Sequence, residues 1–299
     1  MMGTFRGRLA FYGLLALGLI LGVACGRLVV GAAHAGDRYG TIQAGDLTRQ
    51  YFVHVPPSYD GKKPLPLVLV LHGATESPEN IERMSGMSAL ADRENFLAVY
   101  PRGTGRLPTW NAGACCGAAV RDRIDDVGFL TALIDKIERD YTVDSKRTFA
   151  TGISNGGMMS YRLACEVAGR FAAIAPVEGS QDLDCHPSDP ISVIVFHGTA
   201  DQLVPFDGGT TRIQQHRSDT PVRSTVEFWV KQDGCSPTPQ REESATVHIE
   251  TYSGCRAGAA VALYAIQGGH HIWPGTTFSH NDVPATKLIW SFFAEHGKQ

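Results

Sequence analysis

The sequence has little charge and no long run of either sign. Of its 299 residues 19% are charged, and the formal net charge is -3 at pH 7. It therefore has no basic patch of the kind that nucleic-acid binding needs, and we set that class of partner aside. It also has no C-x-x-C pair and no H-E-x-x-H motif, so we expect no metal site.

No charged run, repeat or low-complexity linker divides the chain after residue 36. The chain is also rich enough in apolar residues, at 43%, to bury a sizeable core. We therefore expect residues 36–299 to form one domain.

The first 35 residues differ from the rest. Arg6 and Arg8 precede an uncharged run from Leu9 to Gly26, and Ala33-His34-Ala35 has the form of a cleavage site. This layout is typical of a secretory signal peptide, so residues 1–35 are predicted to direct export to a secreted, periplasmic or cell-surface location. Two alternatives stay open, a membrane anchor and a lipid on Cys25. A membrane is a partner only if this segment is retained or lipidated.

The cysteines of the expected mature chain could form disulfides. Those after residue 35 are even in number: Cys115, Cys116, Cys165, Cys185, Cys235 and Cys255. An even number in an exported chain predicts disulfides, and we expect Cys165 to pair with Cys185 and Cys235 with Cys255. The alternative is that some are free buried thiols.

A serine between glycines stands where a strand is expected to meet a helix. The stretch Thr151-Gly152-Ile153-Ser154-Asn155-Gly156-Gly157 follows a short predicted strand at 147–150 and precedes a predicted helix at 158–166. This is the pattern of a nucleophile elbow, whose sharp backbone leaves no room for neighbouring side chains. Ser154 is therefore the candidate nucleophile. The alternative is a structural serine at a glycine-rich helix start.

Apolar patterns predict strands that alternate with helices. The expected strands are 50–55, 66–71, 96–100, 147–150, 171–175, 191–196, 246–252 and 261–266, and the expected helices are 77–95, one capped by Asp126, 158–166 and 223–232. Such alternation implies an α/β fold with a mainly parallel central sheet flanked by helices.

Loops after two of these strands could supply the oxyanion hole and the acid. We assign the oxyanion hole to the backbone N–H groups of Ala74 and Asn155, and expect the adjacent His72 to be structural.

Asp201, just past strand 191–196, is the expected acid. It is preferred to four other carboxylates, and its alternative role is a turn residue. Those four are Asp182, Asp184, Asp189 and Asp207.

The loop after the last strand carries adjacent histidines, His270 and His271. Either could act as the base on Ser154, and spacing alone does not choose between them. His280 is a more distant candidate. Trp110 lies in a long glycine-rich loop, where it either lines the substrate site or packs over the edge of the core.

Several stretches together resemble one family of exported enzymes. They are Leu71-His72-Gly73, Trp110-Asn111 through Cys115-Cys116-Gly117, Asp125-Asp126-Val127-Gly128-Phe129, the Ser154 elbow, His197-Gly198-Thr199-Ala200-Asp201, and Gly269 through Gly275. The chain thus resembles the polyhydroxybutyrate depolymerase and feruloyl esterase group of α/β-hydrolases, which is related to carbohydrate esterase family one.

That resemblance implies the α/β-hydrolase fold and a serine esterase that acts through an acyl-enzyme without a cofactor. The family's histidine motif, aligned on Trp273-Pro274-Gly275, implies that His271 is the catalytic histidine. His270 then replaces a glycine, and Ile272 replaces a threonine. Trp110 and Trp273 are the candidate substrate-binding residues.

The expected function is the hydrolysis of carboxylic esters. The expected partner is a small-molecule, oligomeric or polymeric ester, either a hydroxybutyrate oligomer or polyester or a feruloyl or acetyl ester. A serine peptidase and a non-catalytic binding protein on the same fold remain the alternatives.

Overall fold

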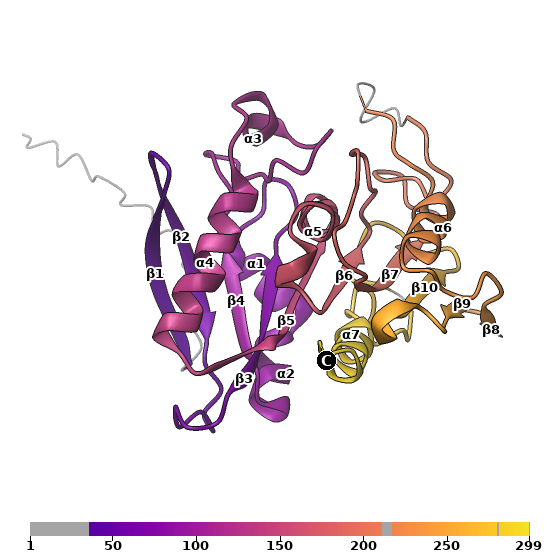
Figure 1. The fold of residues 1–299 in the computed structure, drawn as a ribbon. Coiled ribbons are helices and arrows are strands. Elements are labelled where there is room, and N and C mark those ends of the chain that lie inside the picture. The colour runs from indigo at the N-terminus through magenta and orange to yellow at the C-terminus, as the bar shows by residue number, and fades with distance from the viewer. Residues whose placement is uncertain (1–35, 211–216, 280, 299) are drawn as a thin grey trace, which may run out of the picture. The chain divides into compact units, whose positions relative to one another are not determined.

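A ten-stranded sheet forms the centre of the described chain (Figure 1). The computed structural model describes residues 36–210, 217–279 and 281–298. The predicted signal peptide, residues 1–35, and His280 lie outside these ranges. Within them, the model contains no helix with the length and apolar character needed to cross a membrane.

The sheet has the strand order β1-β2-β4-β3-β5-β6-β7-β10-β9-β8. Its strands are β1 (Asp37–Ala44), β2 (Leu47–His54), β3 (Leu65–Leu71), β4 (Leu97–Pro101), β5 (Val143–Ile153), β6 (Ala173–Val177), β7 (Ser192–Gly198), β8 (Gln240–Glu243), β9 (Val247–Tyr252) and β10 (Val261–Ile266). The run from β4 to β10 is parallel, and antiparallel strands extend it at both ends.

Helices cover both faces of this sheet (Figure 1). They are α1 (Pro78–Ser85), α2 (Met87–Glu94), α3 (Gly117–Arg121), α4 (Asp126–Asp140), α5 (Asn155–Glu166), α6 (Val222–Gln232) and α7 (Ala285–Glu295). Apolar residues of α4, α5 and α6 pack in one core cluster, and those of α1, α2 and α7 pack in the other. Every residue of β3 is buried between the two, as its continuous apolar run predicts. The fold is that of the α/β-hydrolases, as expected.

Two local expectations differ from the structure. The predicted helix 77–95 is divided in two at Gly86, whose φ of 61° ends α1 in the left-handed region that glycine favours. The cap of α4 is Asp125, whose side chain accepts a hydrogen bond from the N–H of Gly128. Asp126, the expected cap, is instead fully buried and contacts Arg49 at 2.7 Å.

Disulfides join all six cysteines that follow residue 35. Cys165 pairs with Cys185 and Cys235 with Cys255, as predicted, and the adjacent Cys115 and Cys116 form the third bond. Each predicted pair closes a 20-residue separation. Cys165 lies at the end of α5, whereas Cys235 and Cys255 lie in the loops that follow α6 and β9.

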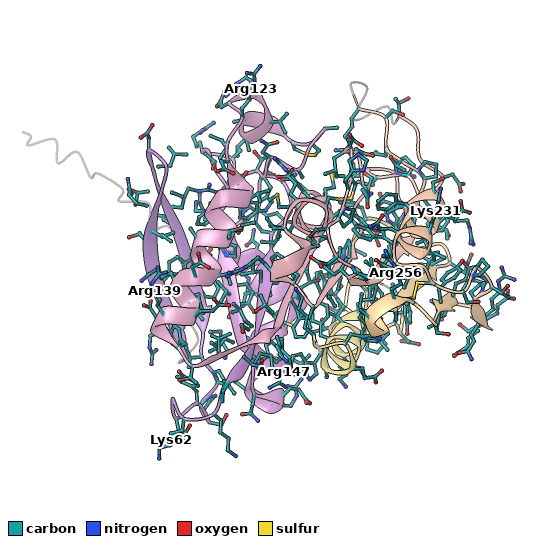
Figure 2. The ribbon with its side chains drawn as sticks, in the orientation of Figure 1. Lys62, Arg123, Arg139, Arg147, Lys231 and Arg256 are labelled. Atoms are coloured by element: carbon teal, nitrogen blue, oxygen red, sulfur yellow. A yellow bond between two sulfur atoms is a disulfide. The ribbon has the colours of Figure 1, made fainter. Side chains whose placement is uncertain are left out.

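Cationic side chains are spread over the described surface. The six that Figure 2 labels come from different parts of the chain.

Candidate active site

The expected elbow is present, and its backbone is strained at the serine. β5 ends at Ile153, α5 begins at Asn155, and Ser154 between them has a φ of 57° and a ψ of -124°. A Cβ atom on Gly152 would lie 2.6 Å from the carbonyl oxygen of Leu71, and one on Gly156 would overlap the same oxygen. The glycines therefore let the turn pack against β3 while the serine keeps a strained, partly accessible position.

Three expected site residues follow neighbouring parallel strands. Ser154 follows β5, Asp201 comes shortly after β7, and His271 comes shortly after β10. Since β5, β6, β7 and β10 are consecutive and parallel in the sheet, their carboxyl ends lie at one edge. The topology thus brings these residues to the same edge of the sheet, where ligand sites of open α/β sheets form.

The aspartate and the histidine are in direct contact. Nδ1 of His271 lies 2.7 Å from Oδ2 of Asp201. The other oxygen of Asp201 accepts hydrogen bonds from the backbone N–H groups of Leu203 and Val204, at 2.7 and 3.0 Å. These bonds fix the carboxylate, and the carboxylate makes Nδ1 the protonated nitrogen of the His271 ring. Nε2 is then left as a proton acceptor.

The Asp201 carboxyl group is held ionised. Burial opposes ionisation, but hydrogen bonds from His197 and His271, together with the charge of His271, hold the pKa of Asp201 well below its usual range.

His270 is placed differently. It is exposed, and its Nδ1 lies 3.1 Å from the carbonyl oxygen of Ala200 rather than near a carboxylate. Of the two adjacent histidines, His271 is therefore the one that contacts Asp201.

The N–H groups expected to form the oxyanion hole are available. Among the described residues, neither the N–H of Ala74 nor that of Asn155 has a hydrogen-bond acceptor. The ring of His72 makes two hydrogen bonds next to the Ala74 loop. Its Nε2 accepts the N–H of Gly103 at 2.9 Å, and its Nδ1 donates to the carbonyl oxygen of Gly73 at 2.7 Å. Burial lowers the pKa of His72 to about 4, so the ring is neutral and structural, as expected.

The side chain of Asn155 has a role that the sequence did not reveal. Its Oδ1 accepts the backbone N–H of Trp110 at 2.7 Å, and its Nδ2 donates to the carbonyl oxygen of Trp110 at 3.0 Å. This pair of bonds ties the Trp110 loop to the residue after Ser154. Both partners are fully buried.

The side chains of the two tryptophans expected to bind substrate are almost completely buried. Trp110 is 0% exposed and Trp273 is 1% exposed. Trp110 donates from Nε1 to the carbonyl oxygen of His72, and Trp273 donates from Nε1 to Thr286. Both rings pack in the interior, and their hydrogen bonds connect loops. For Trp110, packing was the alternative to lining the substrate site.

A buried acid that the sequence reasoning missed lies beside Asp201. Glu178 directly follows β6, is 1% exposed, and accepts the N–H of Gly198 with both carboxyl oxygens at 3.0 Å. Burial first, and then the charge of Asp201, raise the pKa of Glu178 well above its usual range. We therefore describe Glu178 as a neutral acid. Its signal in the sequence is a carboxylate immediately after an apolar strand.

Two groups of side chains within the described residues have the spacing of metal ligands. One is Glu178, Asp201 and His271, and the other is Asp37, His54 and Glu82. In the first group, the Asp201–His271 contact and the Gly198 N–H already use the candidate ligand atoms. The carboxyl oxygens of Glu178 and Asp201 and Nδ1 of His271 are therefore arranged to orient the His271 ring.

Comparison with known proteins identifies the family. A family profile described as "Putative esterase" matches residues 44–183. The "Putative esterase NocK" of Nocardia uniformis subsp. tsuyamanensis is 33% identical over 257 residues, which cover 78% of this chain and 73% of that protein. This chain belongs to the esterase family.

Further relatives agree with this membership. "Feruloyl esterase C" of Emericella nidulans is 29% identical to this esterase, over 82% of this chain and 83% of that protein. The solved acetyl xylan esterase from Aspergillus awamori has a TM-score of 0.62 at 15% identity, and the match covers 86% of this chain and 99% of that one. The structural likeness establishes the shared α/β-hydrolase fold, and the sequence likeness places the esterase among carboxylic-ester hydrolases of the feruloyl esterase group.

Proposed function

We propose that this esterase cleaves its substrate through a covalent acyl-enzyme on Ser154. The observation that carries the proposal is the 2.7 Å contact between His271 and Asp201, at the sheet edge where the strained elbow presents Ser154. A nucleophile, a base and an acid that orients the base are the elements of a serine-hydrolase triad.

In the first half-reaction, Oγ of Ser154 attacks the ester carbonyl carbon while Nε2 of His271 takes the hydroxyl proton. The N–H groups of Ala74 and Asn155 stabilise the oxyanion that forms. The carbon–oxygen bond to the alcohol then breaks, and His271 returns the proton to the leaving alkoxide. The alcohol departs, and the acyl group stays on Ser154.

In the second half-reaction, His271 takes a proton from water as the water attacks the acyl carbon. Collapse of that intermediate breaks the bond to Ser154, which recovers its proton from His271, and the carboxylic acid leaves. Asp201 stays ionised throughout and stabilises the charged His271 ring. Glu178, as a neutral acid beside it, donates a hydrogen bond to Asp201 and so adds to its fixed position.

The substrate and the location belong to the same proposal. We infer a feruloyl, acetyl or hydroxybutyrate ester, small, oligomeric or polymeric, and an exported enzyme. The name of the relative "Feruloyl esterase C" supports the first inference. Three disulfides support the second, since such bonds persist in oxidising compartments.

The test is Ser154→Ala against Ser236→Ala, an exposed serine on a distant loop. We expect turnover of a p-nitrophenyl ester to fall by about a thousandfold or more in the first variant and to stay at the wild-type level in the second. A fluorophosphonate probe should add to the peptide that contains Ser154, as mass spectrometry would show. Unchanged turnover in Ser154→Ala contradicts the mechanism, and faster cleavage of peptides than of esters favours a peptidase.

A further inference from the structure

One donor of the proposed oxyanion hole lies in a strained turn. Residues 73–76 follow β3, and the N–H of Glu76 donates to the carbonyl oxygen of Gly73 at 3.3 Å, which closes a four-residue turn. Ala74 and Thr75 are its central residues. Thr75 has a φ of 67°, although a β-branched residue rarely adopts a positive φ. Such a conformation persists only where neighbouring contacts hold it.

This turn lies beside the nucleophile elbow. A Cβ atom on Gly73 would lie 3.6 Å from the carbonyl oxygen of Ile153, the residue that precedes Ser154. Ala74 is partly accessible and Thr75 is exposed, so the turn reaches the surface next to Ser154. The conformation of the turn therefore decides whether the N–H of Ala74 can point toward an oxyanion at Ser154.

The side chain of Glu76 adds a second bond across the turn. Its Oε2 accepts the backbone N–H of Gly73 at 3.1 Å, and a Cβ atom on Gly73 would lie only 3.2 Å from the same oxygen. Gly73 is buried, so the carboxylate takes the place of water at this N–H. Both backbone polar groups of Gly73 are thus bonded to Glu76, the N–H to the carboxylate and the C=O to the backbone N–H.

These two bonds restrict the direction of the Ala74 N–H. In a trans peptide, the C=O of one residue and the N–H of the next point in opposite directions. The C=O of Gly73 accepts from the N–H of Glu76 and, at 2.7 Å, from Nδ1 of His72, so the N–H of Ala74 points away from both. Because glycine has no Cβ atom to limit its φ and ψ, hydrogen bonds to Gly73 must restrict this peptide.

We propose that Glu76 is a positioning residue of the oxyanion hole. Its carboxylate fixes Gly73, and through Gly73 it keeps the N–H of Ala74 in the direction that stabilises an oxyanion at Ser154. Glu76 acts as a hydrogen-bond acceptor and does not contact the substrate. The inference rests on the proposed function, because the oxyanion forms only if Ser154 attacks the ester.

This role requires the hydrogen bond and not the charge. A negative charge close to an oxyanion opposes its formation. Glu76→Gln keeps an acceptor oxygen and removes the charge, so its kcat should equal that of the wild type within about threefold, or exceed it. Glu76→Ala removes the acceptor, and the N–H of Gly73 is left buried without a partner.

The test measures steady-state kinetics of both variants on a p-nitrophenyl ester. Glu76→Ala should lower kcat by about tenfold or more and change KM by less than about threefold, because the bond from Ala74 to the oxyanion is made in the transition state. Titration with a fluorophosphonate gives the concentration of active enzyme, so an unfolded fraction does not enter kcat.

A trifluoromethyl ketone provides a second measurement. It forms a hemiketal with Ser154 whose oxyanion occupies the proposed hole, so its inhibition constant should rise in Glu76→Ala by about the factor by which kcat/KM falls. A merely structural role of Glu76 would lower the unfolding temperature and leave both constants of the folded enzyme unchanged.

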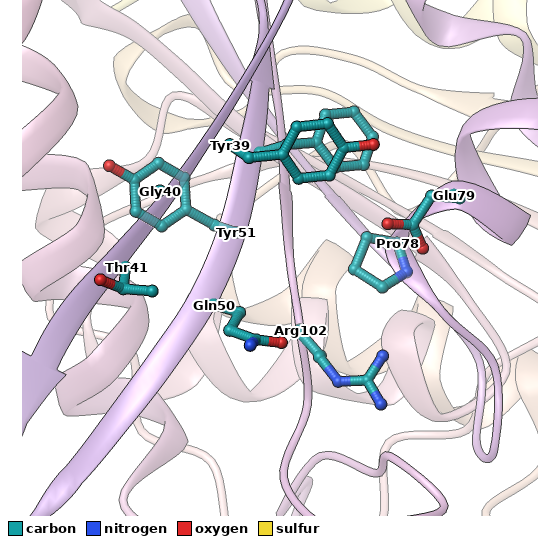
Figure 3. Close-up of a pocket in the computed structure, with 9 residues that line it drawn as sticks. Tyr39, Gly40, Thr41, Gln50, Tyr51, Pro78, Glu79 and Arg102 are labelled. Atoms are coloured by element: carbon teal, nitrogen blue, oxygen red, sulfur yellow. The ribbon is translucent and has the colours of Figure 1, made fainter. Parts of the chain in front are cut away.

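Glu79→Ala is the matched control. Glu79 lies in the first turn of α1 and lines a pocket beside the β1–β2 hairpin (Figure 3). This variant removes the same charge from the same part of the chain without removing the bond to Gly73. Its kcat and its inhibition constant should stay within about twofold of the wild-type values.

An unchanged kcat in Glu76→Ala, or an equal loss in Glu76→Ala and Glu79→Ala, overturns the inference. A Glu76→Gln variant as slow as Glu76→Ala also overturns it, because that result would assign the effect to the charge. In each of these cases, turnover that depends on Ser154 leaves the proposed function intact. Wild-type turnover that does not depend on Ser154 refutes the proposed function itself.

Discussion

The carboxyl groups of Glu178 and Asp201 lie within 4.8 Å of one another, and both are almost without solvent exposure. Their pKa values are shifted in opposite directions, up for Glu178 and down for Asp201. Two adjacent buried carboxyl groups cannot both ionise at moderate cost, so the pair holds one proton. The proton stays with Glu178 because two backbone N–H groups and His271 all favour the anion on Asp201.

This arrangement predicts a neutral side chain at position 178. Glu178→Gln should keep activity within about threefold of the wild type, because the amide N–H can still donate to Asp201. Glu178→Ala should lower kcat by about tenfold or more, since it removes the donor and leaves a cavity.

The pH dependence distinguishes this role from simple packing. As pH rises through the raised pKa, Glu178 ionises beside an anion, so wild-type activity and stability should both fall on the alkaline side. Glu178→Gln should extend the active range upward. An unchanged alkaline limb in that variant would show that Glu178 does not titrate in this range.

The two adjacent histidines should differ sharply. His271→Ala removes the base that contacts Asp201, and kcat for a small ester should fall by about a thousandfold or more. His270→Ala removes an exposed ring bonded to a backbone carbonyl, and activity should change by less than about threefold. Steady-state assays of both purified variants are sufficient. The reverse pattern would show that the histidine loop has the other register.

The side chain of Asn155 should contribute to the stability of the fold, whereas its backbone N–H stabilises the oxyanion. Asn155→Leu keeps the backbone N–H but leaves the N–H of Trp110 buried without a partner and removes one of the two donors to the C=O of Trp110. We expect a loss of about 1–3 kcal/mol in the free energy of unfolding and faster hydrogen exchange in residues 104–117. Asn80→Leu, at an exposed position on α1, is the matched control. Equal stability of the two variants contradicts the prediction.

The buried carboxyl group of Asp233, outside the active site, should make the protein less stable as pH rises. Burial raises its pKa to about 7, and its Oδ2 is buried without a hydrogen-bond partner in the described structure. The folded state therefore holds a proton that the unfolded chain releases at about pH 4. Stability at this site is greatest below pH 4 and falls as pH rises to about 7.

Asp233→Asn should remove that dependence. Its unfolding temperature should exceed that of the wild type at pH 8, by a few degrees for a gain of about 1–2 kcal/mol, and the difference should shrink at pH 5. A difference that does not depend on pH would contradict the assigned proton.

Local features of this esterase could be predicted from its sequence because they depend on the backbone near each residue. The glycines around Ser154 indicate a turn that other residues cannot make, and the apolar run at 66–71 indicates a strand buried on both faces. The order of serine, aspartate and histidine along the chain follows from the order of the parallel strands. The division of the predicted helix 77–95 also has a local cause, because Gly86 adopts a left-handed conformation that the apolar pattern does not indicate.

Burial and contact between distant residues were decided only by the tertiary structure. The pattern offered both His270 and His271, and the position of Asp201 after β7 selects one of them. Trp110 and Trp273 are of a residue type that often lines binding sites, but their side chains are almost completely buried. Glu178 is an ordinary acid in the sequence, and its raised pKa exists because β6 and β7 are neighbours. Sequence patterns record what each backbone segment can form, whereas solvent exposure and charge environment depend on which segments the sheet places side by side.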